Sequence, residues 1–167
     1  RERRLIPYFE VLTWQAFGRT LPTFGPLAIV GAVTGHVALI RHAKKSGHAS
    51  ARDAEIFAMG VVSSAVLSSY FVGTSLAGLV AGAVAAALLA RGLRLPFLGM
   101  FDAMFFALPF GWLFLRAGCA LIHDHVGVAS ASPLAVDFPS GRAFDLGVLE
   151  LLFTPFLIAF TLAQAKK

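Results

Sequence analysis

The chain is divided into long apolar runs by short polar segments. Residues 21–40 form the first run, which contains no Asp, Glu, Lys or Arg and ends at Arg41. The next run, residues 56–90, also lacks these four residue types. As one helix it would be about 50 Å long, whereas the hydrocarbon core of a membrane is about 30 Å thick. We therefore expect it to fold back at residues 73–75 into two spans, 56–72 and 76–90.

Two further runs complete the pattern. One covers residues 101–122, with Pro109 as a kink near its middle, and the other covers residues 144–163. Runs of this length are typical of transmembrane helices. The sequence predicts an all-α fold, a polytopic integral membrane helix bundle of about five transmembrane helices that forms a single domain over residues 1–167.

The segment before the first run is less apolar. Residues 1–20 mix apolar and polar side chains and contain no apolar stretch long enough to cross a membrane. This pattern predicts an interfacial segment, either as a helix that lies in the membrane interface or as an irregular lead-in.

The composition supports a membrane protein and excludes other classes. Hydrophobic residues make up 57% of the chain and charged residues 14%, whereas about 25% of the residues in soluble domains are charged. So few polar residues cannot cover the surface of a soluble domain, and so few charges are not typical of a disordered chain. The net charge of +5 does not indicate nucleic-acid binding, because Lys and Arg form short clusters between the apolar runs.

These basic clusters predict how the chain is oriented. Short loops rich in Lys and Arg stay on the cytoplasmic side of a membrane. Eight basic residues agree on one topology: Arg41, Lys44, Lys45, Arg52, Arg91, Arg94, Lys166 and Lys167. It places residues 123–142 and the N-terminus outside, facing the periplasm or the exterior, although Arg1, Arg3 and Arg4 favour the opposite orientation.

An arginine lies within the fourth predicted span. Arg116 follows about fifteen mostly apolar residues, where a charge is costly and therefore usually functional. It either binds an anion or anchors the outer end of the helix among lipid headgroups. Cys119, the sole cysteine, lies one turn further on. A nearby cation favours a reactive thiolate, but a small cysteine in a membrane helix usually serves only to pack against its neighbours. Because the chain has a single cysteine, the sequence excludes an internal disulfide and leaves no cysteine-based zinc site.

Polar residues are concentrated just after this span. They are His123, Asp124, His125, Asp137, Arg142, Asp145 and Glu150. Three interpretations of residues 123–125 stay open. Two histidines one residue apart can hold a metal ion with Asp124 or Asp145 as a further ligand. A histidine that a carboxylate orients can instead accept a proton from a nucleophile, or the three residues only cap the end of the helix.

The residues around Arg116 resemble the signature of a known family. Residues 115–119, Leu-Arg-Ala-Gly-Cys, are similar to the Arg-x-Gly-Asn/Cys signature of the prolipoprotein diacylglyceryl transferases. Residues 123–127, which end at Gly127, are similar to a variant of the segment after that signature in divergent members of the family. Less specific similarities cover most of the remaining chain, at residues 6–7, 24–29, 75–79, 137–139 and 145–150.

The resemblance implies a multi-pass enzyme of the bacterial inner membrane. It implies transfer of the diacylglyceryl group of phosphatidylglycerol to the thiol of the lipobox cysteine in a prolipoprotein, at the periplasmic face and with no metal or cofactor. The positions that it points to are Arg116 and Gly127 for the lipid phosphate, with Arg142, which is out of register by one residue, as a second cation. His123 or His125 would be the base, and Asp124, Asp145 and Glu150 would support them.

Several positions differ from the family pattern. Leu76 and Leu149 stand where the family has His and Tyr, an arm between the second and third spans is missing, and no helix with a basic motif follows the fifth span. We therefore expect a divergent or truncated member. Two alternatives stay open, a non-catalytic lipid-binding or scaffold relative and a metal-dependent membrane enzyme that uses His123 and His125.

Overall fold

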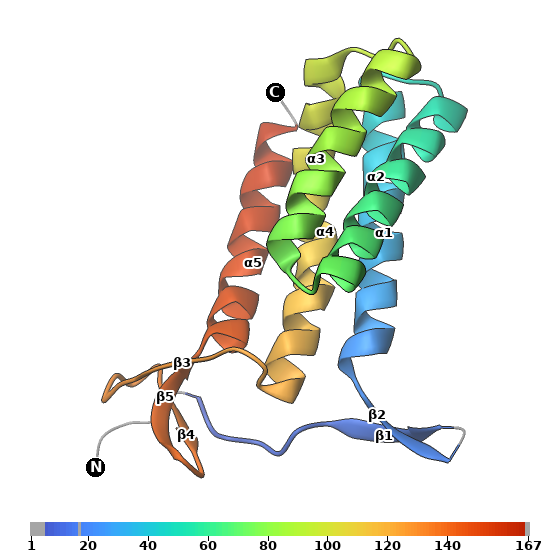
Figure 1. The fold of residues 1–167 in the computed structure, drawn as a ribbon. Helices are drawn as coiled ribbons and strands as arrows, with labels where there is room; N and C mark the ends of the chain where they lie inside the picture. Colours follow the sequence, from blue (N-terminus) through green and yellow to red (C-terminus); the bar gives the residue numbers. More distant parts are fainter. Residues whose placement is uncertain (1–5, 17, 166–167) are drawn as a thin grey trace. The chain divides into compact units, whose positions relative to one another are not determined.

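A computed structural model describes residues 6–16 and 18–165 (Figure 1). The basic residues Arg1, Arg3, Arg4, Lys166 and Lys167 of the topology prediction lie outside the described residues. The helices are α1 (Phe24–Lys45), α2 (Ala51–Val72), α3 (Ser75–Gly92), α4 (Phe97–Ile122) and α5 (Leu146–Gln164). The strands are β1 (Thr13–Ala16), β2 (Arg19–Pro22), β3 (Val126–Ala129), β4 (Val136–Phe138) and β5 (Gly141–Asp145). The fold class is all-α, as predicted.

Four of these helices are long and apolar enough to cross a membrane, namely α1, α2, α4 and α5. The described apolar part of α3, Leu76–Gly92, is shorter, so a fifth crossing stays a prediction. Large apolar side chains remain exposed along the long helices, as at Ile29, Val66 and Phe156. Such surface is unfavourable in water and suits contact with lipid tails. The chain is therefore a multi-pass membrane protein.

The turn that connects α2 to α3 lies where the sequence predicts it. Gly73 ends α2 with φ 75°, a left-handed conformation that favours glycine, and its N–H donates to the Ser69 carbonyl. Thr74 then begins α3, because its hydroxyl accepts a hydrogen bond from the Ala77 N–H at 3.2 Å. The two helices pack along each other (Figure 1).

The chain divides into two units. One contains residues 32–110, and the other joins the chain up to Gly31 with the chain from Gly111 onward. In the 32–110 unit, four helices share a core made mainly of small side chains: Leu39, Ala43, Ala54, Phe57, Ala58, Val61, Ala86, Ala90, Met100, Ala103 and Ala107. His42 of α1 pairs there with Asp102 of α4 at 3.0 Å and stacks on Phe106.

Every strand of the described residues lies in the other unit. A helix in the interface is wrong for residues 13–16, because β1 pairs with β2 in an antiparallel ladder that sets Trp14 opposite Leu21. Gly18 has φ 71°, the left-handed conformation that a tight hairpin turn needs, and the Gln15 amide donates to the Thr20 hydroxyl at 2.7 Å across the hairpin. The N-terminal segment therefore turns back on itself before α1 begins.

The segment between α4 and α5 is a second small sheet, which the hydropathy pattern did not predict. Its order is β3-β5-β4, with both pairings antiparallel. Because β5 continues to Asp145, α5 begins at Leu146, two residues later than predicted. The Asp145 carboxylate accepts a hydrogen bond from the Val148 N–H at 3.2 Å and so caps α5.

The start of α5 lies tightly against the end of α4. A Cβ placed on Gly147 would lie 2.9 Å from the backbone nitrogen of Ala120 and 3.0 Å from the carbonyl carbon of Cys119. A side chain at residue 147 would therefore push the two helices apart. This close approach brings the polar residues of α5 and β5 to the end of α4.

Candidate active site

The end of α4 holds Arg116 among three side chains. Its Nε lies 2.5 Å from a Glu150 carboxylate oxygen of α5. Its guanidinium carbon lies 4.2 Å from the centre of the Trp112 ring, and one terminal nitrogen lies 3.8 Å from the Cys119 sulfur. The ion pair and the cation–π contact fix the guanidinium in place. Only 15% of the Arg116 side chain is exposed, so its charge acts in a partly desolvated setting.

His123 has a buried side chain just after the end of α4. It follows α4 with φ 52°, a left-handed conformation that is uncommon outside glycine. One ring nitrogen, Nδ1, lies 2.5 Å from an Asp145 carboxylate oxygen, and Nε2 lies 2.9 Å from the Phe9 carbonyl. A carbonyl only accepts, so Nε2 donates to it. The ring also stacks on Tyr8.

These contacts give His123 and Asp145 a structural task. Both ring nitrogens of His123 are engaged, and the histidine ties the N-terminal segment to the start of α5. Asp145 is 1% exposed and uses one oxygen for His123 and the other for the α5 cap. Neither side chain is placed to exchange a proton with a substrate.

His125 is in a different position although it is only two residues away. Its Nδ1 pairs with Asp124 at 2.6 Å, and its side chain is 47% exposed. Its Nε2 has no hydrogen-bond partner among the described residues, so His125 is the accessible histidine of the pair. The Leu146 N–H donates to the His125 carbonyl at 3.0 Å and fixes this loop against α5.

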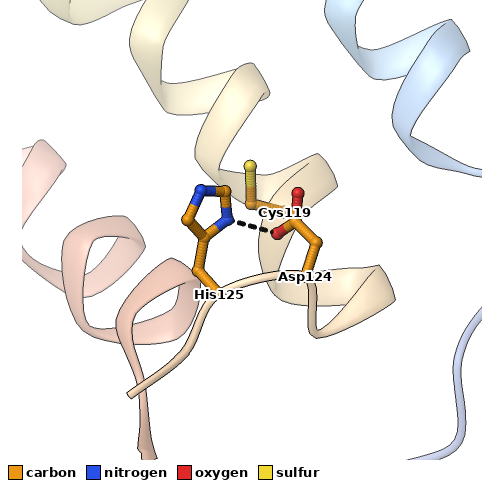
Figure 2. A group of neighbouring side chains, drawn as sticks. All are labelled: Cys119, Asp124 and His125. Atoms are coloured by element: carbon orange, nitrogen blue, oxygen red, sulfur yellow. Dashed lines mark hydrogen bonds and ion pairs between the residues drawn. The ribbon is translucent and has the colours of Figure 1, made fainter. Parts of the chain in front are cut away.

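Cys119 joins the same group. Its sulfur, a carboxylate oxygen of Asp124 and a ring nitrogen of His125 all lie within 4.8 Å of one another. Figure 2 shows the cysteine on the last turns of α4 and the other two side chains on the loop that follows, where a dashed line joins Asp124 and His125. Through the contact between Arg116 and Cys119, the guanidinium and the Asp124–His125 pair form one continuous cluster.

Arg142 is held within the small sheet. It lies opposite Asp137 in the register of β4 and β5, its Nε is 3.1 Å from the Asp137 carboxylate, and it donates to the Ser132 carbonyl at 3.0 Å. These contacts stabilise the loop between β3 and β4. Gly127 of β3 faces Leu146, since a Cβ there would lie 3.3 Å from the Leu146 side chain and from the Phe144 carbonyl. Gly127 therefore allows β3 to pack closely against the start of α5.

The structure thus separates residues that the sequence analysis grouped together. Arg116 and Glu150 meet, Asp124 and His125 meet, and His123 pairs with Asp145 instead of sharing a ligand set with His125. Sequence reasoning did not find Trp112 as a contact of Arg116. The signal was present in the spacing, because residues 112, 116 and 119 lie on one face of a helix.

Comparisons with known proteins bring no relative to set beside this site: no family model matches the chain, and no curated protein matches it.

Proposed function

We propose that this chain is a membrane transferase of the bacterial inner membrane that moves the diacylglyceryl group of phosphatidylglycerol to the cysteine thiol of a prolipoprotein lipobox. Its active face is the periplasmic one, where residues 123–142 lie in the topology that the basic loops favour. The resemblance around Arg116 suggests this reaction, and the geometry at the end of α4 supports it.

The observation that best supports this proposal is one cluster of side chains that contains both a fixed cation and an accessible base. Arg116 is six residues from the end of α4, or about 9 Å along the helix, a depth that a lipid phosphate can reach. Its Nε faces Glu150, and a guanidinium has five N–H donors, so donors remain to bind phosphate oxygens. His125 lies beyond Cys119 in the same cluster, and its side chain is 47% exposed.

In the proposed reaction, His125 takes the proton from the acceptor thiol, and Asp124 stabilises the resulting imidazolium. The sulfur attacks the glyceryl carbon of the lipid that bears the phosphate. A carbon–sulfur bond forms, the carbon–oxygen bond to phosphate breaks, and glycerol phosphate leaves with the electron pair. Arg116 stabilises the charge that builds up on this leaving group.

The test is thioether formation on a lipobox peptide by the purified chain in vesicles that contain phosphatidylglycerol. We expect Arg116→Ala to lower the rate by at least about 100-fold, the usual effect of removing one group that stabilises a developing charge. Arg91→Ala is the matched control, because Arg91 is an exposed arginine in the last turn of α3, and it should retain the wild-type rate.

Glu150→Gln tests whether the ion pair with Glu150 positions the Arg116 guanidinium, because it leaves the charge of Arg116 in place. It keeps the size of the side chain but removes the ion pair with Arg116, so the guanidinium should lose its orientation and the rate should fall by less than in Arg116→Ala. Equal rates for wild type and Arg116→Ala would refute the proposed function. Phosphatidylglycerol bound by the wild type without any product would indicate a lipid-binding relative instead.

A further inference from the structure

The small sheet beside the candidate site has two edge strands that differ in their surroundings. In β4, Val136 is 1% exposed and the Phe138 ring packs against Tyr8. β3 pairs with β5 on one side and with no other strand of the described residues. Its residues Val126 and Val128 are 50% and 73% exposed. β3 therefore leaves apolar side chains and backbone hydrogen-bonding groups uncovered at the border of the sheet.

This open strand begins directly after the base of the proposed reaction. β3 starts at Val126, and the Leu146 N–H donates to the His125 carbonyl at 3.0 Å, so the backbone of His125 is already joined to the sheet. Val126 lies opposite Asp145, and this hydrogen bond flanks the pair. In an antiparallel ladder, two residues in such a position share no hydrogen bond with each other. The N–H and the carbonyl of Val126 therefore point away from β5, toward the open edge.

We propose that β3 binds an extended segment of the acceptor polypeptide as an additional antiparallel strand, with the acceptor cysteine opposite His125. This inference rests on the proposed function, which requires a thiol at this histidine. Extended peptides bind exposed sheet edges in this way elsewhere, with main-chain hydrogen bonds for affinity and side-chain contacts for specificity. Antiparallel pairing is the commoner arrangement and is slightly more stable for each residue.

The geometry of a sheet brings the cysteine to the base. Residues directly opposite each other in an antiparallel pair have Cβ atoms about 4.5 to 5.5 Å apart and project to the same face. A cysteine opposite His125 therefore lies within reach of its ring, on the face where His125 meets Asp124 and Cys119. The residue before the cysteine then lies opposite Val126 and exchanges both of its backbone hydrogen bonds with it.

The exposed valines indicate the chemistry of the bound segment. β3 contains no charged residue, so apolar or small side chains before the cysteine can pack against Val126 and Val128. The strand has four residues, and its register with β5 is irregular between Val126 and Ala129. Short length and a bulge both oppose long edge-to-edge pairing between copies of a chain. This edge therefore suits a few residues of an incoming peptide better than a second copy of the protein.

Methylation of the peptide backbone tests the pairing without any change to the protein. The probe is a lipobox peptide with serine in place of the cysteine, which binds without reacting, and its affinity for the full chain is measured in phosphatidylglycerol vesicles. A methyl group on the nitrogen of the residue before the serine should weaken binding by at least about 10-fold, because it removes the donor to the Val126 carbonyl. A methyl group on the serine nitrogen is the matched control and should change the affinity little, because that nitrogen faces away from β3. Equal affinities of the two methylated peptides would refute the pairing.

A lysine on the open edge tests the same contact from the protein side. Val128→Lys should weaken peptide binding by a similar factor, because a charge on an edge strand opposes pairing with a further strand. Leu134→Lys is the matched control and should bind as the wild type does, since Leu134 is an exposed apolar residue of the same unit that lies outside the strands. Equal weakening by both variants would overturn the site. A wild-type chain that binds no peptide but forms dimers that Val128→Lys separates would show that a second copy occupies the edge instead.

Thioether formation on the cysteine peptides distinguishes this site from the proposed function. The methyl group before the cysteine should raise KM for the peptide and leave kcat nearly unchanged, because it removes a contact that is present both before and during the reaction. If the serine peptides bind with the expected difference but the cysteine peptide gains no thioether, the proposed function fails while the peptide site stands. If thioether forms equally fast on both methylated cysteine peptides, the peptide site fails while the proposed function stands.

Discussion

Asp145 is the residue whose removal should damage the fold most. Its two oxygens serve two elements, since one caps α5 through Val148 and the other pairs with buried His123. Loss of a helix cap costs about 1 kcal/mol, and breaking a buried pair so that one partner stays behind costs about 3 to 5 kcal/mol. We therefore expect Asp145→Ala to lower the free energy of unfolding by about 4 to 6 kcal/mol.

The assay is thermal unfolding of the purified chain in one detergent. For chains of this size each kcal/mol corresponds to about 2 to 4 °C, so the midpoint of Asp145→Ala should fall by at least about 8 °C. Asp145→Asn should fall less, because asparagine caps helices about as well as aspartate and its amide oxygen can still accept from His123.

Thr74→Ala provides the control for a cap alone. Thr74 caps α3 at an exposed position, so its loss should cost about 1 kcal/mol and lower the midpoint by about 2 to 4 °C. If Asp145→Ala unfolds no earlier than Thr74→Ala, then the His123–Asp145 pair contributes nothing to stability, and the structural role assigned to His123 is refuted.

Two further predictions concern helix packing and orientation. Gly147→Ala should lower the unfolding midpoint and the transfer rate, because the new methyl group meets the backbone of α4 within 3.0 Å. Gly92→Ala is the control and should change neither, because a Cβ on Gly92 has nothing within 4 Å. Equal midpoints for the two variants would refute the close approach of α5 to α4. In a Cys119→Ser background, a cysteine placed at exposed Ser140 should react with a membrane-impermeant reagent added outside intact cells, and one placed at exposed Ser46 should not. The reverse pattern would overturn the proposed orientation.

The helices were predictable because the information for each is local. A run such as residues 56–90 is free of charge over its whole length, and Gly73 marks its turn. The strands were not predictable in this way. β3, β4 and β5 have three to five residues each, and their stability depends on pairing between segments that the hydropathy pattern does not connect.

In the candidate site, too, some residues could be identified from local sequence and others only from the fold. Arg116 stood out from sequence alone, because a charge inside an apolar run is costly. Its partner Glu150 lies 34 residues away, and only the packing of α5 against α4 brings the two together. The different settings of His123 and His125 depend on Phe9 and Asp145, so no inspection of residues 123–125 could have assigned them.

The short turn between α2 and α3 bears on how the protein enters its membrane. Gly73 and Thr74 carry no charge, the Gly73 N–H is bonded within the chain, and the Thr74 hydroxyl accepts from the next helix. A connection of this kind leaves few polar groups to strip of water during insertion. We therefore expect the two helices to pass into the bilayer together as one hairpin, with no hydrophilic loop to carry across.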